Sequence, residues 1–182
     1  MIVIAIDPGL TGALAFLGAH TASVHDLPTL ALPISERAGK QFVPRRIDGR
    51  ALALLIREHV PAGTEARAFV ERVQAMQFGG NERGNSAQSQ GSLMRSLGAI
   101  EAALDILQLP PELVTPQAWQ SFYGLVGKGS EIRARGEQHA VTKLMLQIYP
   151  HLERDLRLVK SHNRSDALAI GHFAARKLVP FR

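Results

Sequence analysis

Alternation between apolar and polar positions divides the first third of the chain into short strands and one helix. Three apolar runs, over residues 2–6, 13–17 and 21–26, predict β-strands, and the turn-forming sequence DPGLTG joins the first two into a hairpin. Residues 28–47 contain three prolines and scattered charges, which indicates an irregular segment. Asp48 then begins a helix whose apolar residues recur at helical spacing.

The rest of the chain continues as one further strand pair and several helices. The predicted elements are a strand over 66–73, a polar loop over 77–90, a helix over 92–107, a strand over 113–115, a helix that Thr115 caps and Pro116 opens, a Gly- and Arg-rich loop over 124–136, and helices over 137–149 and 163–178. Neither an internal repeat nor a dividing linker is evident. The order predicts a single α/β domain over residues 1–182, with a mixed central sheet and helices on its faces.

Composition narrows the partners and the kind of metal site. The 182 residues are 46% hydrophobic, which is enough for one core, and they carry 21 Lys and Arg against 16 Asp and Glu, a net charge of +5. A basic surplus favours polyanionic partners, because neutralising a phosphate releases a counterion. The chain has no cysteine, which excludes disulfides and thiolate metal sites.

Targeting and membrane signals are not evident in the sequence. The N-terminal apolar run reaches only five residues before an acid, and it lacks the basic start and cleavage site of a signal peptide. No stretch approaches the eighteen or so apolar residues of a membrane span. We therefore expect a cytoplasmic protein without a membrane partner.

Three acidic residues stand in apolar surroundings at the start, middle and end of the chain. Asp7 ends the first strand, Glu71 lies in the fourth, and Asp166 opens the apolar face of the last helix. Burying a carboxylate is costly unless it is paired or binds a cation, and converging carboxylates suit Mg²⁺ or Mn²⁺. Structural roles stay open for each: a turn residue for Asp7, an ion pair with Arg72 for Glu71, and a helix-dipole partner for Asp166.

Three sequence motifs that contain these acids strengthen the interpretation that they form a functional site. Residues 4–12 (IAIDPGLTG), 69–71 (FVE) and 162–170 (HNRSDALAI) resemble, in order and spacing, the motifs of RuvC-like Holliday junction resolvases of the ribonuclease-H-like superfamily. The TPQAW stretch at 115–119 and the HNRSDALAIG ending resemble the phage-type members more than the standard bacterial resolvase. The resemblance implies a ribonuclease-H-like fold with a mixed five-stranded central sheet flanked by helices.

The resemblance also implies a Mg²⁺- or Mn²⁺-dependent endodeoxyribonuclease that resolves four-way DNA junctions with two ions per active site. Asp7 would bridge the ions, and Glu71 and Asp166 would each help to hold one; one ion would activate water and the other would stabilise the leaving 3′ oxygen. The family often has a fourth acid three residues before the last one, where this chain has Asn163. His162 is the first choice for the fourth group and Asn163 the second, and Asn163 could instead cap the helix.

The predicted DNA contacts lie in the loops and beside the third motif. Phe78, the only aromatic residue in the loop over 77–90, could stack on an unpaired base or plug the core. Side chains that would contact phosphate or sugar, unless they are merely solvated, are Asn81, Arg83, Lys128, Arg133, Arg135, Lys160 and Arg164. Arg45, Arg46 and Arg50 form a further basic cluster without an assigned role.

A four-way junction has near two-fold symmetry, so the resemblance implies a homodimer. The helix over 92–107 is the interface candidate, although core packing explains its apolar stripe equally well. DPGLTG also resembles the phosphate-binding hairpin of sugar kinases and actin, but those proteins are much longer and have a second glycine-rich phosphate loop, which is not found here. A resolvase-like module that binds branched nucleic acid without cutting it, and a nuclease of the same fold that acts on flaps, forks or RNA hybrids, both stay open.

Overall fold

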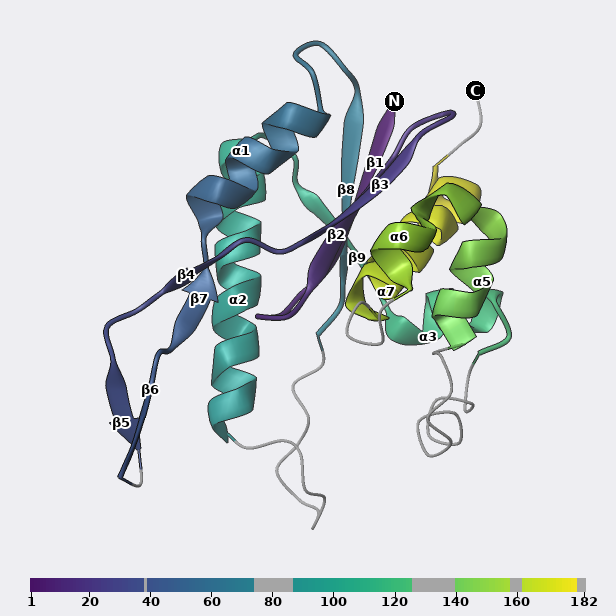
Figure 1. Ribbon diagram of the computed structural model, residues 1–182. Coiled ribbons are helices and arrows are strands. Elements are labelled where there is room, and N and C mark those ends of the chain that lie inside the picture. The colour runs from purple at the N-terminus through teal and green to yellow at the C-terminus, as the bar shows by residue number, and fades with distance from the viewer. Residues whose placement is uncertain (38, 74–86, 126–139, 158–161, 180–182) are drawn as a thin grey trace.

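A five-stranded sheet with helices on both faces forms the centre of the structure (Figure 1). The computed structural model describes residues 1–37, 39–73, 87–125, 140–157 and 162–179. In sheet order the strands are β3 (Ala22–Asp26), β2 (Ala13–Leu17), β1 (Ile2–Asp7), β8 (Ala66–Glu71) and β9 (Pro111–Val114). The first three strands pair antiparallel, whereas β1, β8 and β9 are parallel. The mixed five-stranded sheet flanked by helices confirms the predicted α/β fold class.

Two layers of helices cover the sheet. On one face lie α1 (Gly49–His59) and α2 (Ala87–Ile106), and on the other lie α3 (Pro116–Phe122), α5 (Ala140–Ile148), α6 (Glu153–Leu156) and α7 (His162–Phe173) (Figure 1). A 3₁₀ turn over Pro150–Leu152 precedes α6, and a π-helical segment over Ala174–Leu178 follows α7. None of the helices in the described ranges is long and apolar enough to cross a membrane.

The period-two alternation of β1 assigns its side chains to the two layers. Ile4 and Ile6 belong to the apolar cluster under α1 and α2, while Val3 and Ala5 belong to the cluster under α7. α7 lies very close to the sheet at Gly171, where an added Cβ would be 2.3 Å from Leu17 Cδ1. Because small residues allow this approach, the first turn of α7 reaches the edge of the sheet where β1 ends.

Sequence signals for the helix starts are confirmed. The Asp48 carboxylate accepts a hydrogen bond from the Ala51 N–H at 3.0 Å, which caps α1. Thr115 caps α3 in the same way, with Pro116 at its first position. In α2, Ile100 and Leu104 are fully buried against the sheet, so these two residues serve the core rather than a partner subunit.

The predictions of irregular structure were wrong at two places. Residues 28–47 form two antiparallel strand pairs: β4 (Thr29–Ala31) with β7 (Arg45–Ile47), and β5 (Ser35–Arg37) with β6 (Lys40–Phe42). The three prolines of this segment lie between the strands, where proline removes no hydrogen bond of the ladder. They therefore end the individual strands but do not prevent their pairing. The polar loop expected over 77–90 also gives way to α2 from residue 87 onward.

Candidate active site

Two of the predicted acids lie side by side at the carboxyl end of the sheet. Asp7 is the last residue of β1 and Glu71 is the last residue of β8. The residues before them, Ile6 and Val70, are direct partners in the parallel ladder. Asp7 and Glu71 therefore share a sheet face, and the alternation of both strands makes it the face that α7 covers.

α7 adds the third acid to this edge. Asp166 lies in its second turn, between the fully buried residues Ser165 and Ala167, and its Oδ1 atom is shielded from solvent. Burial first, and then the carboxylates of Glu71 and Asp166, raise the pKa of Asp7 well above its usual range. The structure thus brings the Asp7 carboxylate close enough to those of Glu71 and Asp166 to be repelled by both.

Trp119 is a site residue to which the sequence had given no role, although it ends the TPQAW stretch. Its indole Nε1–H donates a hydrogen bond of 2.8 Å to Oε1 of Glu71, and its side chain is only 2% exposed. Burial raises the pKa of Glu71, and this hydrogen bond to the charged form acts in the opposite direction. The one signal in the sequence was that the chain has a single tryptophan, placed at the end of the TPQAW stretch immediately after β9.

The chemistry of these donors fits a hard divalent cation. The three side chains offer only carboxylate oxygens, and their mutual repulsion would be relieved by positive charge. Within the described ranges, however, no three Asp, Glu and His side chains are already arranged as a set of metal ligands. The carboxylates are therefore neighbours in a partly buried position whose electrostatics favour a cation.

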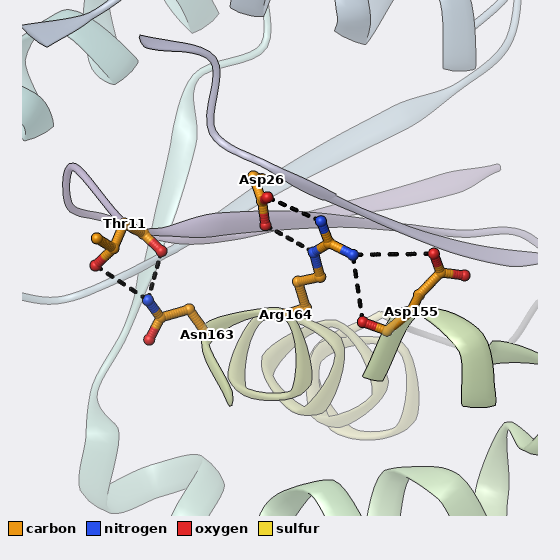
Figure 2. Close-up of polar contacts among 5 residues, drawn as sticks. All are labelled: Thr11, Asp26, Asp155, Asn163 and Arg164. Carbon is orange, nitrogen blue, oxygen red and sulfur yellow. Dashed lines mark hydrogen bonds and ion pairs between the residues drawn. The ribbon is translucent and has the colours of Figure 1, made fainter. Parts of the chain in front are cut away.

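Asn163 connects the start of α7 to the turn after β1. Its side-chain amide donates to the backbone carbonyl of Thr11 and, at 3.2 Å, to the Thr11 hydroxyl (Figure 2). The turn itself is tight, because a Cβ on Gly12 would lie 2.2 Å from the Asp7 carbonyl oxygen. Asn163 thus fixes α7 beside the strand end that carries Asp7, and its role as a metal ligand stays a prediction.

Arg164, predicted to contact DNA, is held by two carboxylates. Its Nε and Nη2 atoms donate to the two carboxylate oxygens of Asp26 at 2.6 and 2.8 Å, and Nη1 donates to the Asp155 carbonyl at 3.3 Å (Figure 2). The Asp155 carboxylate is farther, at 3.9 Å from Nη1. The guanidinium therefore ties α7 to β3 and to α6, and a phosphate would have to compete with Asp26 for it.

His162 lies on the exposed first turn of α7, one helical turn before Asp166. Residues four apart share a helix face, so His162 can approach a group that Asp166 holds. Its assignment as the fourth group stays a prediction. The remaining predicted DNA contacts lie outside the described residues: Phe78, Asn81, Arg83, Lys128, Arg133, Arg135 and Lys160.

Comparison with known proteins gives matches in structure only. No family model matches the chain, and no curated protein matches it. A structure of T. thermophilus RuvC in complex with Holliday junction substrate aligns at a TM-score of 0.48 and 18% identity, over 97% of this chain and 95% of that chain. Another Thermus thermophilus RuvC structure aligns at 0.46 and 18%, over 97% and 96%. Similarity at this level carries no argument about activity, which has to come from the residues of the site.

Proposed function

We propose that this protein is a metal-dependent endonuclease acting on DNA. The observation that carries the proposal is the convergence of Asp7, Glu71 and Asp166 at the carboxyl end of the sheet, where burial and then the carboxylates of Glu71 and Asp166 raise the pKa of Asp7. Three carboxylates in a partly buried position are unfavourable without a cation, and perturbed acids of this kind concentrate at functional sites. The order and spacing of the three motifs around these acids point to the same chemistry.

Each carboxylate has its own part in the proposed site. The Asp7 carboxylate interacts electrostatically with both of the others, which suits it to serve as the shared metal ligand of the site. Trp119 fixes Oε1 of Glu71 and leaves Oε2 to serve as a ligand. Asp166 approaches from α7 on the same sheet face. When bound, Mg²⁺ or Mn²⁺ ions would supply an activated water and stabilise the leaving 3′ oxygen of the cut strand.

A fourth group would complete the site. We assign this role to His162, whose imidazole shares a helix face with Asp166 and can ligate a metal or orient water. Asn163 is the second choice, since its amide already donates to Thr11. The two assignments separate in experiment, because Asn163 also fixes α7 to the β1–β2 turn.

The proposed substrate is a four-way DNA junction. The motif resemblance supplies this substrate class, and the net charge of +5 suits a polyanion. A homodimer would place two such sites on the two strands that exchange at a junction of near two-fold symmetry. Met94 on α2 is 48% exposed and so remains accessible to a partner subunit, unlike the buried residues of the same helix.

A cleavage assay tests the proposal directly. Labelled four-way junction, flap, fork and linear duplex would each be incubated with the full chain in Mg²⁺, Mn²⁺ or EDTA. We expect symmetric cuts near the junction centre that require metal and are lost in Asp7→Asn. Glu58→Gln, at an exposed acid near the end of α1, is the matched control and should cut normally.

The outcomes separate the candidate functions. Cutting of flaps or forks in place of junctions would keep the nuclease and change its substrate. Tight junction binding by the wild-type protein without any cutting would identify a binding module instead. Normal cutting by Asp7→Asn would refute the assignment of the metal site.

A further inference from the structure

The segment between β3 and α1, residues 28–47, forms a two-stranded arm. It leaves the sheet at the same end as the carboxylates, since β3 ends at Asp26 beside the β2 residue that pairs with Asp7. At its base, the Leu27 N–H donates to the Gly12 carbonyl at 2.9 Å, and Gly12 closes the turn that follows Asp7. The Asp48 N–H donates to the Pro28 carbonyl at 2.9 Å, which closes the base from the other side. Figure 1 shows the arm extending beyond α2, away from the sheet.

Basic side chains dominate the arm and the helix start beside it. Lys40, Arg45 and Arg46 are exposed on the arm, and Arg50 is exposed in the first turn of α1. Among the described side chains of residues 28–47, the one exposed acid is Glu36. Arg45 is oriented by its own strand pair, since its Nε donates to the Thr29 hydroxyl at 2.9 Å. The exposed cations are thus distributed from the base of the arm, next to the end of β1, out to β6.

We propose that this arm is a docking surface for a duplex limb of the DNA substrate. The inference rests on the proposed function, because it requires DNA at the carboxylate edge. A duplex limb leaving that edge would pass along the arm, where Lys40, Arg46 and Arg50 neutralise backbone phosphates. Contacts of this kind position the duplex without reading its sequence.

The arm also exposes apolar residues, which raises the question of a protein partner. Ile34 is 67% exposed, Phe42 41% and Val43 52%. A second copy of this chain also has a net charge of +5, so it would place positive charge against the cations of the arm. Repulsion between like charges opposes that association. Phosphates complement the same charges, so the charge balance favours DNA over a second copy.

The test is the salt dependence of junction binding by the full-length chain in EDTA. Binding of a labelled four-way junction would be measured by fluorescence anisotropy across a series of NaCl concentrations. The arm variant carries Lys40→Gln, Arg46→Gln and Arg50→Gln. The control variant loses the same charge elsewhere, through Arg57→Gln in the last turn of α1 and Arg176→Gln with Lys177→Gln in the π-helical segment after α7, all at exposed positions.

Three lost phosphate contacts should reduce the slope of log K against log salt by about 2.7, and binding at about 0.1 M salt should weaken tenfold or more. The control variant should keep the wild-type slope. A charge-preserving variant, Lys40→Arg with Arg46→Lys and Arg50→Lys, should restore it. Thermal unfolding of all three variants should match the wild type because the positions are exposed.

Each other result overturns the inference in a distinguishable way. If the wild-type protein cuts and binds junctions while the arm variant keeps its slope, the arm inference alone fails. Equal losses in the arm and control variants would also refute it, since the effect would then be that of overall charge. A change in dimerisation without a change in the salt slope would assign the arm to a second copy. No junction binding by the wild type would overturn the arm and the proposed function together.

Discussion

Replacing Trp119 tests how the protein prepares Glu71 to hold a cation. The indole N–H lies 2.8 Å from Oε1 of Glu71, and a hydrogen bond to a charged group contributes roughly 1.5–3 kcal/mol. Cation binding requires the ionised carboxylate, which this bond favours. Losing the donor should therefore weaken Mn²⁺ binding by about 10- to 100-fold, the usual effect of removing a group that orients a metal ligand.

Shape and hydrogen bonding have to be separated in this experiment. Trp119 is 2% exposed, so Trp119→Phe also leaves a cavity and lowers the free energy of unfolding. A benzothienylalanine at position 119 replaces the N–H by sulfur and keeps the bicyclic shape. Phe173→Leu is the control for packing, because Phe173 belongs to the same apolar cluster and makes no hydrogen bond to Glu71.

Calorimetric titration of Mn²⁺ into the DNA-free protein gives the affinity without relying on catalysis. The benzothienyl variant should bind Mn²⁺ weakly while unfolding near the wild-type temperature, and Phe173→Leu should show the reverse. Loss of the N–H also raises the pKa of Glu71, so the difference in affinity should grow as the pH falls. Wild-type affinity in the benzothienyl variant would refute the positioning role of Trp119.

Three further changes follow from the same geometry. Asp7→Asn should raise the unfolding temperature in EDTA at neutral pH, because the raised pKa of Asp7 makes its ionised form unfavourable in the folded protein. The wild-type stability is full below the unfolded pKa near 4 and falls by about 1.4 kcal/mol for each pH unit between that value and the folded pKa. Equal unfolding temperatures at pH 7 would contradict this. Gly171→Ala should cost about 1–3 kcal/mol in denaturant unfolding, since its Cβ would lie 2.3 Å from Leu17 Cδ1, and a neutral result would show that α7 can shift freely. Asp26→Asn should change stability by less than about 1 kcal/mol and tighten junction binding by releasing Arg164, whereas weaker binding would show that the ion pair itself serves DNA.

The central sheet and its helix starts follow directly from the sequence. Short apolar runs next to turn residues predicted all three N-terminal strands, and the capping residues Asp48 and Thr115 predicted two helix starts. The same runs placed Asp7 at the end of the first strand and Glu71 inside the fourth, and the structure ends that strand at Glu71. Local chemistry decides these features, so a single sequence is enough to predict them.

Other features depend on partners that are distant in the chain. The strands of the arm over residues 28–47 have only three residues each, which is too short for a periodic signal. The pairing of β4 with β7 joins residues about sixteen positions apart in the sequence, such as Thr29 and Arg45. Trp119 meets Glu71 across 48 positions, and Arg164 meets Asp26 across 138. Nothing in the local pattern reveals the ion pair of Arg164 with Asp26, and the DNA contact of Arg164 stays a prediction.

The fixation of α3 and α7 explains how three mutually repelling acids can remain together. α7 is attached to the β1–β2 turn through Asn163 and pressed against the sheet at Gly171. At the end of α3, the Tyr123 hydroxyl lies 3.1 Å from the Ala169 carbonyl of α7 and 2.7 Å from Nδ1 of His172. α3 also carries Trp119, so the helix that orients Glu71 is bonded to the helix that carries Asp166. Packing and hydrogen bonds thus hold the carboxylates against their repulsion, and the electrostatic energy that remains unfavourable in the metal-free protein is available to favour a bound cation.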